Sequence, residues 1–205
     1  MDHIKNSTQA TLEIKRSVFT ADVVKMTDEA LLKPYLESLR ALYPKSHHIT
    51  YAAHIHEGRF QKYSDDGEPK GTAGYPILEA ITHYDITDVV VTVRRDFGGI
   101  PLGSSGLIRA YREAAHEALK KMERLKKKTT LTVSFQLSYK EYDLLKLFLN
   151  DWLMDVALDF SERVLISGFI LKHQVDAFKK LLIDRLNRTL DIHLGPENIQ
   201  YLADE

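Results

Sequence analysis

The 205-residue chain contains no cysteine, one tryptophan and six prolines. Without cysteine it can form no disulfide bond, use no thiol nucleophile and build no zinc site from cysteine ligands. An excess of charge is also absent, because 28 Lys and Arg residues oppose 29 Asp and Glu residues, a formal net charge of -1. This balance excludes a general attraction of the whole chain to nucleic acid or to a membrane. Any site for a polyanion must therefore be a local patch.

Long apolar runs are missing as well. No stretch approaches the roughly 20 apolar residues that span a bilayer, so we expect no membrane partner. Residues 1–6 carry charged and polar side chains in place of the apolar stretch of a signal peptide. The sequence therefore predicts a cytoplasmic protein.

The apolar residues that are present suffice for two α/β domains, because they make up 44% of a chain long enough for two units of about 100 residues. In the first half, hydrophobic spacing predicts helices over 27–43, 76–84 and 107–126, and strands within 11–25 and over 49–57 and 88–95. In the second half it predicts strands over 131–137, 156–160, 164–170 and 190–194, and helices over 140–151 and 174–188. This β-α-β-β-α-β order is the ferredoxin-like arrangement.

A lysine-rich run separates the two halves. Residues 120–128 hold six Lys or Arg against one Glu, and the composition changes at Thr129. The run is consistent with the solvated end of the preceding helix, whose dipole favours cations, or with a contact for a polyanion. We predict domains over 1–128 and 129–205.

A polar loop over 64–74 is the first candidate site. Asp65, Asp66 and Glu68 place three carboxylates within four positions. Oxygen-rich loops of this kind can hold Mg²⁺ or Ca²⁺, although the spacing is not that of an EF-hand. Alternatively, the loop is a turn that needs its glycines for positive φ and its aspartates for local hydrogen bonds.

A glycine-rich loop over 96–106 is the second candidate. A buried strand enters it and a helix leaves it, so free backbone N–H groups and the helix dipole favour an anion there. The spacing matches neither a nucleotide P-loop nor a dinucleotide fingerprint, and a tight packing turn is the alternative interpretation. The residues of this candidate anion site are Arg94, Arg95, Gly98, Gly99, Gly103, Ser104, Ser105 and Arg109.

Three histidines form the third candidate. His48, His54 and His56 share strand parity and point to the same, outer face of the predicted strand 49–57. Together with Asp65 or Glu68 they could ligate zinc, or they are simply exposed side chains. Ser64, Ser104 and Ser105 are nucleophiles by type, but no neighbouring base activates them, so we expect no covalent catalysis.

The two loops taken together resemble the IMPACT/YigZ family. The resemblance rests on residues 64–69, 71–74 and 76 of the acidic loop and on Arg95, 97–99, 102–103 and 106–111 of the glycine-rich one. Residues 15–21, 48 and 51–52 fit as well. It implies an N-terminal, ribosomal-protein-like α/β sandwich similar to domain IV of elongation factor G. The C-terminal half then resembles domain V of that factor.

The resemblance also implies a function. Eukaryotic relatives regulate translation in the amino-acid-starvation response, bacterial relatives are proposed to bind RNA or ribosomes, and the family has no agreed catalytic residues. We therefore expect a non-enzymatic RNA- or ribosome-associated protein, without a cofactor, that modulates translation or the stress response. The expected phosphate contacts are Arg94, Arg95, Arg109, Lys70 and the glycine-rich backbone. The expected supporting residues are His48, His54 and Thr72.

Two other functions remain open from the sequence. The acidic side chains either position the arginines or hold a bridging cation, and a divalent metal on Asp65, Asp66 and Glu68 could also activate water. That arrangement would make the protein a metal-dependent small-molecule hydrolase or phosphatase. A protein-interaction module without any small ligand is the third interpretation.

Overall fold

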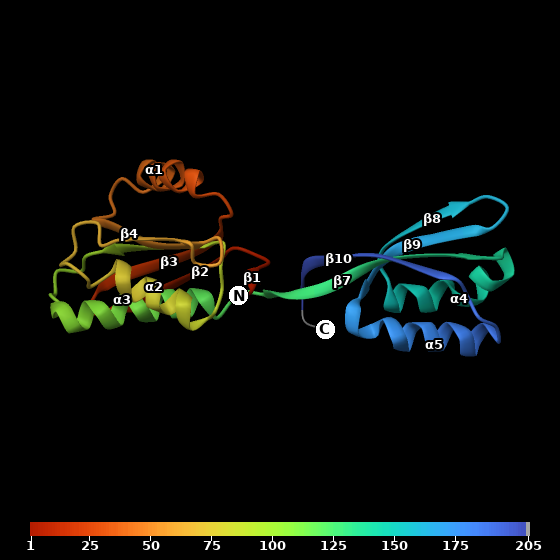
Figure 1. The fold of residues 1–205 in the computed structure, drawn as a ribbon. Coiled ribbons are helices and arrows are strands. Elements are labelled where there is room, and N and C mark those ends of the chain that lie inside the picture. Colours follow the sequence, from red (N-terminus) through yellow and green to blue (C-terminus); the bar gives the residue numbers. More distant parts are fainter. Residues whose placement is uncertain (204–205) are drawn as a thin grey trace. The chain divides into compact units, whose positions relative to one another are not determined.

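The chain folds into two compact units in this computed structural model, which describes residues 1–203. Unit 1 comprises residues 1–126 and 201–203, and unit 2 comprises residues 127–200 (Figure 1). The sequence predicts that all residues after 128 belong to the second domain. Residues 201–203 nevertheless belong to unit 1, where the ring of Tyr201 stacks on His3 with centroids 3.5 Å apart.

Unit 1 is built on an antiparallel sheet of five strands in the order β2-β3-β6-β4-β5. The hairpin of β2 and β3 turns at Lys15 and Arg16, which both adopt positive φ. The bounds of the five strands are Thr8–Ile14 for β2, Ser17–Lys25 for β3, His48–Ile55 for β4, Phe60–Ser64 for β5 and Val89–Asp96 for β6.

Helices cover both faces of this sheet (Figure 1). Helices α2 (Gly74–His83) and α3 (Gly103–Leu119) pack on one face, with Phe19 and Tyr111 in the core between them and the sheet. Helix α1 (Leu32–Leu42), which the short 3-10 helix η1 (Glu29–Leu31) precedes, covers part of the other face. The central strands β4 and β6 are therefore buried on both sides, which explains the nearly continuous apolar run of β6.

The prediction that the histidines of β4 lie on an outer, exposed face of the strand is therefore wrong. His54 is only 1% exposed, because its side of the sheet, which also carries Ala52, faces the core under α2 and α3. His48 lies half-buried at the start of the strand, and His56 lies beyond its end with φ 56°. The alternation of apolar residues was correct, but local sequence does not indicate which helices will cover the second face.

Only the start of the lysine-rich run lies at a helix end, as predicted, because Lys120 is the C-cap of α3 and the residues from Arg124 onward form a strand. Helix α3 ends at Leu119, and β7 begins at Arg124 and continues to Leu137. The first residues of β7 pair with the two-residue strand β1 (His3–Ile4), with His3 opposite Leu125. This partner lies about 120 residues away in the sequence, so the local composition gives no sign of it.

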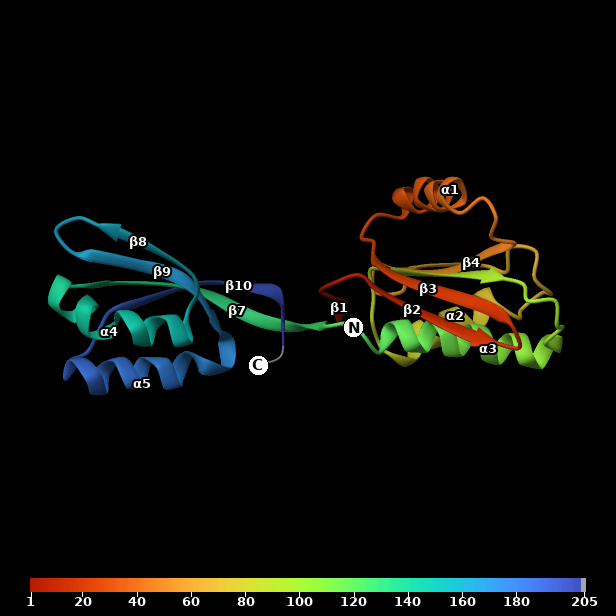
Figure 2. The same cartoon turned by 180° about the vertical axis from the view of Figure 1, so that it is seen from behind.

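Unit 2 has the element order expected from the sequence, β-α-β-β-α-β, and a sheet in the order β10-β7-β9-β8. Its two long helices lie on the same face of that sheet (Figure 2). The remaining bounds are α4 Tyr139–Trp152, β8 Met154–Phe160, β9 Val164–Leu171, η2 Lys172–Gln174, α5 Val175–Leu186 and β10 Ile192–Ala203. Among residues 1–203, no helix is long and apolar enough to cross a membrane.

A capping box starts helix α4. The Ser138 hydroxyl accepts from the backbone N–H of Glu141, and the Glu141 carboxylate accepts in return from the Ser138 backbone N–H. The guanidinium of Arg188 donates to the same carboxylate at 2.7 Å. These donors, Arg188 first, lower the pKa of Glu141 to about 2.

This lowered pKa predicts a dependence of stability on pH. Because the pKa of Glu141 is lower in the folded chain than its usual 4.5, its contribution is fully present above pH 4.5. We expect that contribution to be lost as the pH falls towards 2. Urea unfolding of the Glu141→Gln variant should show a smaller loss of stability over this range than the unchanged chain, and an equal loss would contradict the assignment.

The core of unit 2 offers a second test on one helix. Leu145 is 0% exposed in the core, whereas Leu147 is 79% exposed. We expect Leu145→Ala to lower the free energy of unfolding by about 2–5 kcal/mol and Leu147→Ala to change it little. The fluorescence of Trp152, the only tryptophan of the chain, reports this unit directly. Equal effects of the two substitutions would refute the helix orientation.

Candidate functional site

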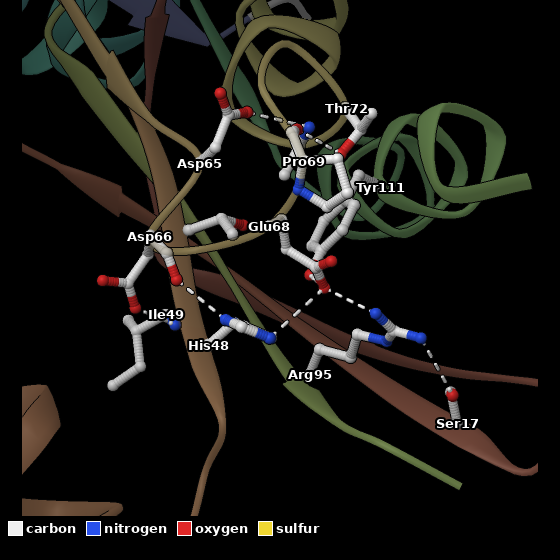
Figure 3. A network of polar contacts seen from close by, with 12 residues as sticks. Ser17, His48, Ile49, Asp65, Asp66, Glu68, Pro69, Thr72, Arg95 and Tyr111 are labelled. Carbon is white, nitrogen blue, oxygen red and sulfur yellow. Dashed lines mark hydrogen bonds and ion pairs between the residues drawn. The ribbon is translucent and has the colours of Figure 1, made fainter. Parts of the chain in front are cut away.

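The acidic loop and strand β6 meet at the carboxylate of Glu68, whose side chain is 3% exposed. Oxygen Oε1 of Glu68 accepts from Nη1 of Arg95 at 2.6 Å and from the hydroxyl of Tyr111 at 2.7 Å. Arg95 comes from β6 and Tyr111 from α3, so three distant segments converge on one oxygen (Figure 3). A buried charge needs such partners, because water cannot solvate it there.

The guanidinium of Arg95 is enclosed on its other sides as well. Its Nη2 lies 3.5 Å from the hydroxyl oxygen of Ser17, which also accepts from the backbone N–H of Gly98 at 3.2 Å. The rings of Phe19 and Phe97 lie 5.5 and 5.2 Å from its central carbon. Buried Arg95 therefore joins the acidic loop, the start of β3 and the glycine-rich loop.

Asp65 fixes the loop to the start of helix α2. Its carboxylate accepts from the backbone N–H groups of Gly71, Ala73 and Gly74 at 2.8–3.0 Å. An acidic side chain at this end satisfies N–H groups that the helix leaves free and also opposes the positive end of its dipole. Thr72 closes the turn by donating its hydroxyl to the carbonyl of Pro69 at 2.7 Å.

Asp66 anchors the loop to strand β4. Its carboxylate accepts from the backbone N–H of Ile49 at 2.6 Å and pairs with Arg40 of α1. Its backbone carbonyl accepts from Nδ1–H of His48 at 2.7 Å, which leaves the other ring nitrogen of His48 3.9 Å from Glu68 (Figure 3). Asp66 and Gly67 both adopt positive φ, which makes the turn tight enough for these contacts.

Burial and the Glu68 carboxylate also act on Tyr111. Loss of solvent, followed by its hydrogen bond to Glu68, raises the pKa of Tyr111 far above its usual value. The hydroxyl consequently stays protonated and serves as a hydrogen-bond donor. Tyr111 is therefore a fixed structural donor at this site and does not act as an acid or base near neutral pH.

The glycine-rich loop lies against the β2–β3 hairpin. A Cβ atom at Gly98 would come within 2.0 Å of the carbonyl oxygen of Arg16, so only glycine fits there. Beyond it, helix α3 begins at Gly103 without a hydrogen bond from a capping side chain. Ser104 and Ser105 are exposed at that helix start.

The structure separates the cations that the sequence grouped together. Arg94 is 8% and Arg95 5% exposed, and Arg94 stacks on Tyr43 at 3.5 Å while it pairs with Asp22 at 3.1 Å. Both side chains are therefore engaged inside unit 1, and our expectation that they contact phosphate from an exposed pocket is wrong. Arg109 and Lys70 are exposed. Gly99 also lies in the accessible part of the loop, with φ 81°.

The carboxylates of the acidic loop are also occupied. Asp65 binds three backbone N–H groups, Asp66 an arginine and a backbone N–H, and Glu68 an arginine and a phenol. Among residues 1–203, no group of three His, Asp or Glu side chains is arranged to hold a metal ion. Only Glu68 fits the predicted role of positioning an arginine of the second loop, because Asp66 pairs with Arg40 and Asp65 makes the local hydrogen bonds of a turn. The occupied carboxylates do not fit a bridging cation.

Sequence reasoning missed several residues of this site. Tyr111 and Ser17 were included only in the matched segments 106–111 and 15–21, because neither residue type by itself indicates a contact with a buried ion pair. The exposed pair of Tyr63 and Tyr75, with ring centroids 5.9 Å apart, went unnoticed because strand β5 was not predicted. A search for exposed aromatic residues next to the acidic loop would have found both.

Known proteins resemble this chain in sequence and in fold. The family described as the Impact N-terminal domain matches residues 15–119, which hold the acidic loop, the glycine-rich loop and Tyr111. This chain belongs to the IMPACT family. The IMPACT family member YvyE of Bacillus subtilis is similar to this chain in sequence. The two are 27% identical over 194 residues, which cover 94% of this chain and 89% of that protein.

Two further relatives extend the comparison. An IMPACT family member of Thermus thermophilus is 38% identical over 128 residues, which cover 62% of this chain and 69% of that protein. A crystal structure of a hypothetical protein is 26% identical, covers 96% of this chain and 97% of that chain, and has a TM-score of 0.58. The likeness to known proteins, in sequence and in mixed α/β fold, therefore extends over both halves of the chain.

The buried pair of Glu68 and Arg95 can be tested by stability. Glu68→Gln removes the negative charge but keeps an oxygen for Tyr111, so it leaves a buried guanidinium without its counter-ion. We expect it to lower the free energy of unfolding by an amount at the lower end of roughly 3–5 kcal/mol. Denaturant unfolding followed by circular dichroism provides the measurement.

Glu79→Gln is the matched control, because Glu79 pairs with Arg112 on the surface. Both partners are at least 40% exposed, and we expect its loss to cost less than about 1 kcal/mol. If the two variants are equally stable, Glu68 does not hold the loops together.

Proposed function

We propose that this protein is a non-enzymatic, cytoplasmic regulator of translation or of the stress response that binds RNA or the ribosome through unit 1. Its membership of the IMPACT family supports the translation-related role. The observation that carries the RNA contact is a set of exposed cations on the β2–β3 hairpin, the acidic loop and helix α3. Its components are the exposed cations Lys15, Arg16, Lys70 and Arg109.

The hairpin tip and the loop combine two features that favour phosphate. Lys15 and Arg16 are exposed at the tip, and Gly98 lies directly against Arg16. The start of α3 adds backbone N–H groups that no side chain caps. The acids Asp65, Asp66 and Glu68 are taken up by internal contacts, so the acids that face a phosphate here are the exposed Glu13 and Asp96 beside the hairpin tip.

We also propose the finer fold assignments as part of this function. Unit 1 would correspond to domain IV of elongation factor G and unit 2 to a ferredoxin-like domain similar to domain V. The β-α-β-β-α-β order and the strand order β10-β7-β9-β8 of unit 2 support the second assignment. Such an arrangement suits a protein that meets the ribosome where translation factors bind.

The metal-dependent hydrolase is the weaker candidate. Its proposed ligands Asp65 and Glu68 already accept hydrogen bonds at 3.0 Å or less, and a metal would have to displace them. Removing Glu68 from Arg95 would leave the guanidinium buried without a counter-ion. A protein partner fits the same exposed residues, but it gives no reason for an uncapped helix start in a unit with exposed cations on its hairpin tip.

Salt dependence tests the RNA contact. We expect binding of the whole chain to ribosomes or structured RNA to weaken steeply as salt rises, because phosphate contacts release counter-ions. Arg16→Gln should reduce the slope of log affinity against log salt by about one. Lys33→Ala is the matched control, because Lys33 lies on α1 with an 86% exposed side chain, and it should leave the slope unchanged. Absence of binding even at low salt would refute the proposal.

A further inference from the structure

Two tyrosines lie exposed side by side on the surface of unit 1. Tyr63 on β5 and Tyr75 in the first turn of α2 are each 48% exposed, and their rings meet edge to face at 65°. In such a pair, the edge of one ring covers one face of the other. The remaining ring faces stay open to a third planar group.

Arg109 lies on helix α3, which packs against α2. Glu79 of α2 pairs with Arg112 of α3, and four residues later on each helix the ring of His83 lies 5.6 Å from that of His116. Because both contacts advance by four residues on each helix, α2 and α3 run parallel where they meet. Equal steps of four residues in the other direction bring the exposed Tyr75 on α2 level with Ile108 on α3, and the exposed Arg109 directly follows Ile108.

The charge around the two rings is positive. Arg109 forms no ion pair with any residue in the described range 1–203, and Lys70 is exposed in the loop that Asp65 fixes to the start of α2. The carboxylates of Asp65 and Asp66 are bound to backbone N–H groups and to Arg40. Exposed rings and exposed cations thus occur in neighbouring segments, while Asp65 and Asp66 are engaged in internal contacts.

We propose that Tyr63, Tyr75 and Arg109 form a binding site for single-stranded RNA, in which the tyrosines stack on bases and Arg109 contacts phosphate. Sites for single strands combine aromatic platforms with cations in this way, because every base offers a flat face once it is unpaired. In a duplex the bases stack on each other and cannot reach the rings. This inference rests on the proposed function and adds the form of the RNA and its stacking residues.

Binding of a labelled single-stranded RNA of about 12 nucleotides, within the range of known site sizes, tests the proposal by fluorescence anisotropy at low salt. We expect Tyr63→Ala combined with Tyr75→Ala to weaken binding by about tenfold or more. Tyr63→Phe combined with Tyr75→Phe keeps both rings and should bind like the unchanged chain. Arg109→Gln should lower the salt slope by about one, whereas the uncharged ring variants should leave it unchanged.

Tyr139→Ala is the matched control, because Tyr139 is 49% exposed in unit 2, and it should leave binding unchanged. Circular dichroism establishes that every variant is folded. If the unchanged chain binds RNA but the alanine pair binds equally well, or if duplex RNA competes as strongly as a single strand, the stacking site is refuted and the proposed function stands. If the unchanged chain binds no RNA at low salt, the proposed function itself fails.

Discussion

The organisation of unit 1 depends on one ionic contact away from water, that between Glu68 and Arg95. A carboxylate and a guanidinium lose several kcal/mol each when they leave water, so the pair needs partners that replace water. Tyr111 and Ser17 supply them from a helix and a hairpin, and His48 lies 3.9 Å from Glu68 on a strand, whereas the buried Nε of Arg95 has no hydrogen-bond partner among the described residues. The contact therefore fixes the loops at a common point more than it adds to overall stability.

Much of the fold follows from the sequence. Apolar periodicity indicates the helices α1, α2 and α3 of unit 1 and the β-α-β-β-α-β order of unit 2, because a helix or strand must bury one face. It fails for β5, a mostly polar edge strand, and for the start of β7, whose partner β1 is far away in the chain. It also fails for His54, since burial of the second face of β4 depends on tertiary packing.

For the two loops as well, the sequence predicts one part of the structure, and tertiary packing decides the other. Paired motifs identify the acidic and glycine-rich segments, and the structure brings them together, but at a buried point and not in an exposed pocket. Arg94 and Arg95 look like phosphate ligands in the sequence because charged side chains are usually exposed to solvent. In the structure each has an internal carboxylate and an aromatic ring, so exposed cations at the periphery carry the charge available to a ligand.

The close approach of Gly98 to Arg16 has a consequence for how this surface can evolve. Because the two backbones touch without room for a methyl group, the hairpin tip and the glycine-rich loop cannot change length independently. An insertion in one would push the other away and detach Ser17 from Gly98. Variation among relatives should therefore accumulate in the side chains displayed here, while the spacing of the two segments stays constant.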